Sequence, residues 1–169
     1  MTSGMRCTGH TVPELLAMLG IASILAVAAV PVFSNLLLEA RMNAALATTM
    51  HAVNLARQLS ATRSVLMRLC GSDNEVSCSG RPDWTAGLLL VDESESFRQG
   101  VPLSGGSGTP RIRSNRATLS FEAGSGFATP ATLTLCDRRG SRAARSVIVS
   151  RSGRPRASDR DASDKALSC

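Results

Sequence analysis

Near the N-terminus lies a long apolar stretch, Leu15–Leu38, which contains no charged residue. As a helix it would extend roughly 36 Å, enough to cross a bilayer core of roughly 30 Å. It is too long for the apolar core of a secretory signal peptide, and no turn signal ends it. The stretch therefore predicts a membrane-spanning helix, which Gly20 and Pro31 would soften or kink.

Apolar residues continue beyond this stretch at mostly three- and four-residue steps, as in an amphipathic helix. They are Met42, Leu46, Met50, Val53 and Leu59. The pattern predicts one helix from about Glu14 to about Leu69. Residues 10–38 would be its transmembrane and assembly part, and residues 39–69 its amphipathic continuation.

After Leu69 the chain changes to short runs of β-type residues separated by turn residues. The runs are Trp84–Val91, Arg111–Arg113, Ala117–Phe121, Ala131–Cys136 and Arg145–Ser150. Several alternate apolar and polar positions, as strands with one buried face do. The predicted fold class is α+β, with a long N-terminal helix packed on a small antiparallel sheet formed by residues 70–169.

Five cysteines are divided unevenly about the apolar stretch, because Cys7 precedes it and the other four follow it. An even set on one side of a membrane segment indicates disulfides in an oxidising compartment. We expect the pairs Cys70–Cys78 and Cys136–Cys169, although four cysteines allow three pairings and their order does not choose among them. Zinc is not expected, because the spacing does not suit a zinc knuckle and residues 70–169 contain no histidine.

Basic charge is concentrated in one short segment. Residues 137–156 carry seven arginines and one aspartate, in a chain whose net charge is +6. The arginines are Arg138, Arg139, Arg142, Arg145, Arg151, Arg154 and Arg156. Solubility would not require this clustering, so it indicates an anionic partner, a solvated basic surface or contact with acidic neighbours.

The residues just before the apolar stretch, Gly9-His10-Thr11-Val12-Pro13-Glu14-Leu15-Leu16, resemble the type III signal of type IV pilins and type II secretion pseudopilins. The resemblance implies that residues 1–9 are a leader. A prepilin peptidase would cut between Gly9 and His10, and the new N-terminus would be methylated. His10 stands where the family usually has Phe, and Pro13 replaces an aliphatic residue.

Glu14 would be the conserved glutamate of that signal. A lone carboxylate at the edge of a bilayer costs roughly 2.5–3.5 kcal/mol, or snorkels to the interface. The resemblance implies that it pairs with the cationic amine of His10, on the same or a neighbouring subunit, and so sets the register of a filament.

The rest of the chain is similar to the FimT/GspH family of pilin-like proteins, and most similar in pattern to its FimT branch. The similarity lies in Leu69-Cys70, Cys78, Trp84–Val91, Leu133–Gly140, Val147–Ser150, Gly153-Arg154-Pro155-Arg156 and Cys169. In FimT-type minor pilins the Gly-Arg-x-Arg motif is implicated in binding DNA during natural transformation. The resemblance therefore implies a DNA-binding role for Gly153, Arg154 and Arg156 within the basic segment.

The residue types agree with that role. Guanidinium groups suit phosphate oxygens, Gly153 would let the chain bend and approach closely, and Pro155 would fix the backbone between Arg154 and Arg156. The segment has almost no aromatic residue, so base stacking is not expected. Contact would be with the backbone of double-stranded DNA, independent of sequence and sensitive to salt.

The sequence thus predicts a minor pilin of a type IV pilus that supports pilus assembly and DNA uptake. The alternative is a GspH-like pseudopilin of a type II secretion system. Either would be a single-pass protein of the inner membrane with a periplasmic head, later part of a filament with other pilins. We expect no enzyme and no cofactor, because a catalytic base is lacking: the two histidines are His10 and His51.

Overall fold

A computed structural model describes residues 11–103 and 108–169, and only the backbone of residues 28–32. The expected leader, the cleavage site at Gly9 and His10, and Cys7 lie outside the described residues. The chain divides into two compact units, Met1–Leu37 and Leu38–Cys169. The second unit is called the head below.

One helix, α1 (Val12–Arg63), contributes to both units and places Glu14 in its first turn. In the first unit its large apolar side chains are exposed, among them Leu15, Leu19 and Ile24. Where the structure describes side chains, no helical stretch is both long enough and apolar enough to cross a membrane.

The helix ends at Arg63, so the expected end near Leu69 is wrong. Ser64 has a φ of 52°, a left-handed conformation that stops a helix. The chain then enters a strand, β1 (Met67–Gly71), whose residues are mostly buried. A short apolar run of this kind is compatible with helix or strand, and here the neighbouring strands decide it.

The head contains two four-stranded antiparallel sheets rather than the one sheet expected. The first sheet has the order β3-β2-β1-β5 and the second the order β4-β6-β7-β8. Strands of the first sheet, besides β1, are β2 (Leu88–Asp92), β3 (Arg98–Val101) and β5 (Thr118–Phe121). Those of the second are β4 (Arg111–Ser114), β6 (Ala131–Cys136), β7 (Arg145–Val149) and β8 (Pro155–Ser158). A short 3-10 helix, η1 (Ser141–Ala143), precedes β7.

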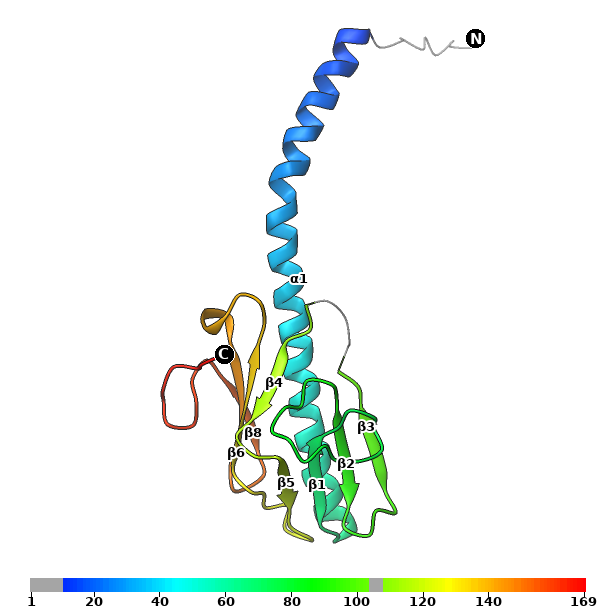
Figure 1. Cartoon of the computed structure of the whole chain (residues 1–169), viewed down its shortest axis with the longest axis vertical. Helices are drawn as coiled ribbons and strands as arrows, with labels where there is room; N and C mark the ends of the chain where they lie inside the picture. The colour runs from blue at the N-terminus through cyan, green and yellow to red at the C-terminus, as the bar shows by residue number, and fades with distance from the viewer. Residues whose placement is uncertain (1–10, 104–107) are drawn as a thin grey trace, which may run out of the picture. The chain divides into compact units, whose positions relative to one another are not determined.

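The core of the head forms where the α1 residues from Leu38 onward meet both sheets (Figure 1). On α1 the fully buried side chains include Met42, Ala52 and Val53. On the second sheet alternate residues of β6 are buried, such as Leu133 and Leu135, while the threonines between them are half-buried. The alternation seen in the sequence therefore corresponds to one face against the helix and one face outward.

All five expected runs contain a strand, and the structure adds three strands that the sequence did not indicate: β1, β3 and β8. The run that begins at Trp84 is a strand only from Leu88. Trp84 itself is fully buried in the preceding loop, with its ring against Gly71. Its backbone is not part of a strand, although its N–H donates to the Ile112 carbonyl of β4 at 2.9 Å.

Both expected disulfides, Cys70–Cys78 and Cys136–Cys169, are confirmed. The second joins β6 to the C-terminus and holds the last residues against the outer face of the second sheet. Leu167 is buried beside Cys136 and Ala144. The Ser146 hydroxyl donates to the Arg160 carbonyl at 2.6 Å. Residues 159–169 are called the tail below.

Candidate functional site

The second sheet divides the arginine-rich segment into two groups. Four arginines lie on the connection between β6 and β7 or at the start of β7: Arg138, Arg139, Arg142 and Arg145. Three follow β7: Arg151, Arg154 and Arg156. Because β7 is an extended strand of five residues, it separates the groups by roughly 16 Å. The arginines that cluster in the sequence therefore form two separate surface patches.

In the first group Arg139 is engaged in ion pairs. Its Nη1 donates to Glu39 Oε2 of α1 at 2.7 Å, and its Nε and Nη2 donate to Asp137 Oδ2 at 2.9 and 2.7 Å. Arg145 Nη2 lies 3.8 Å from the other carboxylate oxygen of Glu39. These two arginines fasten the second sheet to α1, whereas Arg138 and Arg142 are exposed.

The ionisation of this cluster follows from its contacts. Burial by itself would raise the pKa of Asp137, but the hydrogen bonds and charge of Arg139 outweigh burial and hold that pKa below its ordinary value. Hydrogen bonds to Asp137 and then to Glu39 raise the pKa of Arg139. The pair is therefore ionised under all physiological conditions and acts as a structural link.

The second group occupies the turn between β7 and β8 and the start of β8. In this turn the Gly153 N–H donates to the Ser150 carbonyl at 2.9 Å, and the Ser150 N–H donates to the Arg154 carbonyl at 3.1 Å. Arg151, Arg154 and Arg156 are all exposed. None of the three forms an ion pair with any carboxylate of the described residues. They are called the arginine turn below.

Gly153 has a packing role that the sequence did not indicate. It is buried, with a φ of 72°, and a side chain there would collide with the Gly126 carbonyl and the stem of Arg57. Arg57 Nε in turn donates to the Ser152 carbonyl at 3.0 Å. Gly153 thus lets the turn pack closely against α1 and the β5–β6 connection.

Pro155 begins β8, the outermost strand of the second sheet. A proline is tolerated at the start of an edge strand, because its missing N–H removes no ladder hydrogen bond needed by a further strand. Arg154 and Arg156 stand two residues apart on either side of it, so in an extended chain they project to one side. Arg156 lies opposite Ile148 of β7.

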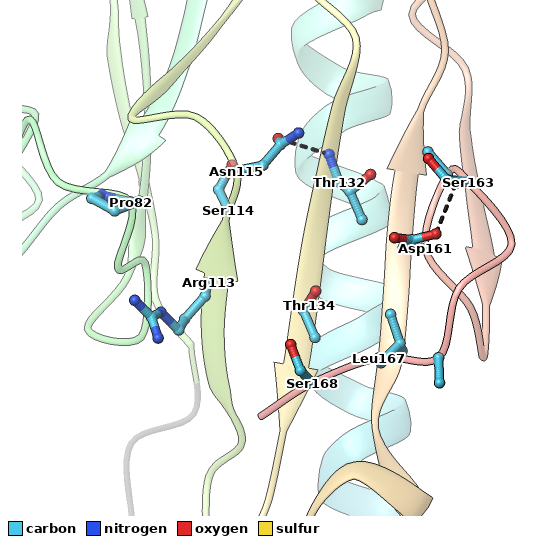
Figure 2. Close-up of a pocket in the computed structure, with 12 residues that line it drawn as sticks. Pro82, Arg113, Ser114, Asn115, Thr132, Thr134, Asp161, Ser163, Leu167 and Ser168 are labelled. Carbon is cyan, nitrogen blue, oxygen red and sulfur yellow. Dashed lines mark hydrogen bonds between the residues drawn. The ribbon is translucent and has the colours of Figure 1, made fainter.

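The outer face of the second sheet carries further basic residues that the sequence reasoning missed. Arg111 and Arg113 alternate with the buried Ile112 on β4, so both point outward. Arg113 lines a polar groove of about 420 Å³ between the sheet and the tail. Figure 2 shows this groove, with Thr132 and Thr134 of β6 on its floor and tail residues across it. The alternating pattern of β4 was a signal that could have identified them.

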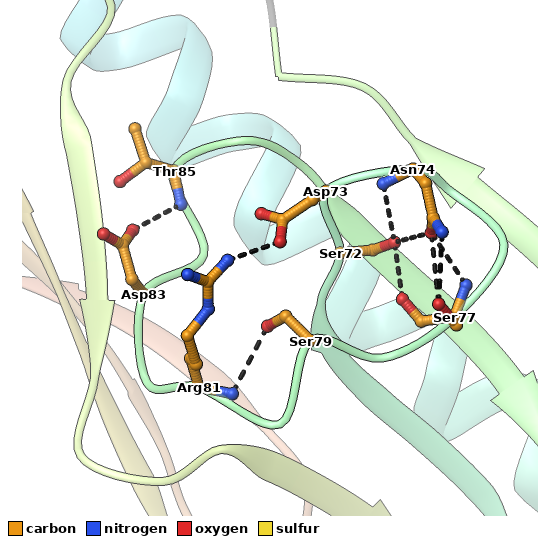
Figure 3. Close-up of polar contacts among 8 residues, drawn as sticks. All are labelled: Ser72, Asp73, Asn74, Ser77, Ser79, Arg81, Asp83 and Thr85. Carbon is orange, nitrogen blue, oxygen red and sulfur yellow. Dashed lines mark hydrogen bonds and ion pairs between the residues drawn. The ribbon is translucent and has the colours of Figure 1, made fainter.

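The loop closed by Cys70–Cys78 and the residues after it form a network of local polar contacts (Figure 3). The Asn74 side-chain oxygen accepts from the N–H groups of Val76 and Ser77, each at 3.0 Å, and Arg81 pairs with Asp73. Hydrogen bonds from Thr85 lower the pKa of Asp83. The network satisfies the loop's own polar groups, which indicates a structural role.

His51 is exposed on α1. Among the residues that the structure describes, no group of three or more His, Cys, Asp or Glu side chains lies close enough to hold a metal ion. The described chain therefore offers basic surfaces, a polar groove and an exposed apolar helix face as its candidates for function.

Comparison with known proteins places these features in context. The family described as type II transport protein GspH matches residues 45–153. A crystal structure of the type IV minor pilin FimU from Pseudomonas aeruginosa PAO1 matches with 18% identity, a TM-score of 0.55, and coverage of 76% of this chain and 94% of that chain. A second crystal form gives 17% identity, a TM-score of 0.52, and coverage of 75% and 98%. No curated protein gives a significant match. At these identities the likeness to FimU is one of fold.

Proposed function

Because this chain belongs to the GspH family, we propose that it is a minor pilin of a type IV pilus and that its arginine turn binds double-stranded DNA for uptake in natural transformation. The membership supports a pilin-like or pseudopilin-like role. The proposal that this pilin binds DNA rests on the arrangement of its exposed arginines.

Assembly would depend on α1. After a prepilin peptidase removes residues 1–9 between Gly9 and His10, the helix would anchor the protein in the inner membrane with its head in the periplasm. Its exposed apolar side chains, such as Leu16 and Leu25, would then pack against those of other pilins in the filament. Glu14 would pair with a new N-terminal amine and set the axial register.

The role of Glu14 can be tested with Glu14→Ala. The variant should still insert into the membrane, because the apolar stretch is unchanged, but it should be depleted from filaments that are sheared and blotted. Glu39→Ala is a useful comparison, because Glu39 lies on the same helix but pairs with the head. Normal incorporation of Glu14→Ala would remove Glu14 from this account.

The proposal of DNA binding rests on the exposure and the charges of the arginine turn. Arg151, Arg154 and Arg156 are exposed, have no carboxylate partner among the described residues, and sit on a turn that α1 and the β5–β6 connection hold in place. Such preorganised guanidinium groups suit phosphate oxygens. They would grip the DNA backbone without reading its sequence.

The test is a gel-shift titration of the full chain in nonionic detergent with double-stranded DNA of unrelated sequences. Replacing both Arg154 and Arg156 with Ala should weaken binding to all sequences alike. It should also reduce the slope of log K against log salt by about 2. Arg98→Ala is the matched control, because Arg98 is engaged with Glu95 on the first sheet. Unchanged affinity in the double variant would contradict the proposal.

A second candidate is a minor pseudopilin of a type II secretion system, favoured by the description of the matching family. It predicts loss of protein secretion, and no change in DNA uptake, when the gene is deleted. The first candidate predicts the reverse.

A further inference from the structure

Outside α1, two large apolar side chains of the described residues are exposed: Val76 at 56% and Phe127 at 49%. The chain has only four Phe, one Trp and no Tyr. Of these aromatic rings, Phe33 on α1 and Phe127 are exposed. Phe127 lies on the connection between β5 and β6, outside the arginine-rich segment and 24 residues before Arg151.

The fold brings Phe127 beside the arginine turn. On one side of it, Gly126 lies so close to Gly153 that no side chain fits between them. On the other side, the Ala128 N–H donates to the Arg151 carbonyl at 2.9 Å. Figure 1 draws both connections near the same end of the head. Phe127 thus stands between two backbone contacts with the turn that carries the exposed arginines.

Hydrogen bonds hold the backbone of Phe127 in place, and its ring is 49% exposed. The Phe127 carbonyl accepts from the Glu122 N–H at 2.7 Å, and its own N–H donates to the Ser125 hydroxyl at 3.2 Å. Ala128 forms a bridge with Phe121 of β5. The carboxylate of Glu122, on the same connection, accepts from the Ser125 hydroxyl. The backbone that carries the exposed ring is therefore well ordered by its own hydrogen bonds.

We propose that Phe127 and the arginine turn form one site for single-stranded DNA, in which the arginines hold phosphates and the ring stacks on an unpaired base. The inference rests on the proposed binding of duplex DNA by the same arginines and adds a second form of DNA, an open strand, that the arginines and the ring would bind together. Basic side chains beside an exposed aromatic ring are the combination by which proteins bind single strands without sequence preference. In an intact duplex the bases are already stacked on one another, so Phe127 contributes only where a strand is open, as at an end or a gap.

A neighbouring pilin is the other occupant that could cover Phe127. Burial in a filament contact would use the apolar surface of the ring, and a leucine would serve nearly as well. Stacking on a base needs an aromatic face, and a leucine would not replace it. This difference separates the two occupants.

The experiment measures fluorescence anisotropy of labelled oligo(dT) and of a blunt duplex with the full chain in nonionic detergent. Phe127→Ala should weaken binding of oligo(dT) by roughly 5- to 100-fold and leave duplex binding within about twofold. Phe127→Trp should retain binding of oligo(dT), whereas Phe127→Leu should lose it as Phe127→Ala does. Val76→Ala is the matched control for an exposed apolar side chain. Thermal melting verifies that each variant is folded.

Each outcome decides the matter. If Phe127→Ala weakens both DNA forms equally, or neither, the single-strand site is overturned, while loss of duplex binding on replacing Arg154 and Arg156 still supports the proposed function. If the unaltered chain binds neither form, both proposals are overturned. If Phe127→Ala is depleted from sheared filaments and binds oligo(dT) normally, the ring belongs to a pilin contact and the inference is wrong.

Discussion

Arg139 and Glu39 are joined by a hydrogen-bonded ion pair of 2.7 Å, although they are one hundred positions apart in the chain. Arg139 follows β6 and Glu39 lies on α1, so the contact ties the second sheet to the helix. Asp137, whose side chain is only 1% exposed, accepts from the same guanidinium. An arginine that the sequence grouped with DNA-binding residues is thus part of the framework.

Replacing Arg139 with Ala should destabilise the head by about 1–3 kcal/mol, because the buried carboxylate of Asp137 loses its charged donor. Arg138→Ala should have almost no effect on stability, since that neighbouring side chain is exposed. Urea unfolding followed by circular dichroism compares the two. Equal stability of both variants would contradict the structural role of Arg139.

Stability should fall on the acid side, and Asp137 should contribute to the fall. Its folded-state pKa lies below the ordinary value of 3.8, so its contribution is complete above that value and is lost as the pH falls through the lowered pKa. The hydrogen bond from Ser96 lowers the pKa of Asp92, and its contribution has the same sign.

The measurement is the urea midpoint at several pH values between about 7 and 2. Asp137→Asn should be less stable than the unaltered protein at neutral pH, and the difference should shrink below the ordinary pKa of Asp137. Asp159→Asn, on the exposed tail, is the control. A difference that stays constant down to the lowest pH would refute the linkage.

Gly153 and Gly140 allow a matched test of close packing. Both have positive φ, 72° and 76°, but a side chain at Gly140 would meet nothing, whereas one at Gly153 would meet Gly126 and Arg57. Gly140 has a ψ of −160°, in a region that is essentially restricted to glycine, so Gly140→Ala should cost about 1–3 kcal/mol from backbone strain. Gly153→Ala should cost a further 1–3 kcal/mol or so from overpacking. Chemical unfolding measures both, and equal losses would show that the turn tolerates displacement.

The two disulfides should differ in their contributions. Cys136–Cys169 closes a sequence separation of 33 and Cys70–Cys78 one of 8. By loop-closure entropy the first contributes about 4 kcal/mol and the second about 2.5 kcal/mol. Replacing the first pair with Ser should also speed hydrogen exchange in residues 159–168. The tail would then be held by burial of Leu167, the Ser146–Arg160 contact and the hydrogen bond from the N–H of residue 169 to Ser141. A tail that stays protected would show that those contacts suffice.

The residue types of the candidate site could be anticipated from the sequence. The separation of its arginines into two groups could not. Seven arginines in one segment predicted a basic surface, and Arg154 and Arg156 are indeed exposed beside Pro155. Arg139 and Arg145 instead form ion pairs with Glu39. The sequence could not show this, because Glu39 is close to them only in the folded chain. The close packing of Gly153 against Gly126 could not be predicted, because the two residues lie far apart in the sequence.

By itself the sequence determined the features that depend on neighbouring residues, namely a long N-terminal helix and alternating strands such as β6 and β7. It also supplied enough cysteines for two disulfides. The helix and the strands follow from periodicity and residue preference, which neighbouring residues carry. Only the tertiary structure decided that α1 stops at Ser64, that the strands form two sheets, and that Phe127 lies beside Arg151. Those features depend on contacts between residues remote in the chain, where packing and hydrogen bonding outweigh local preference.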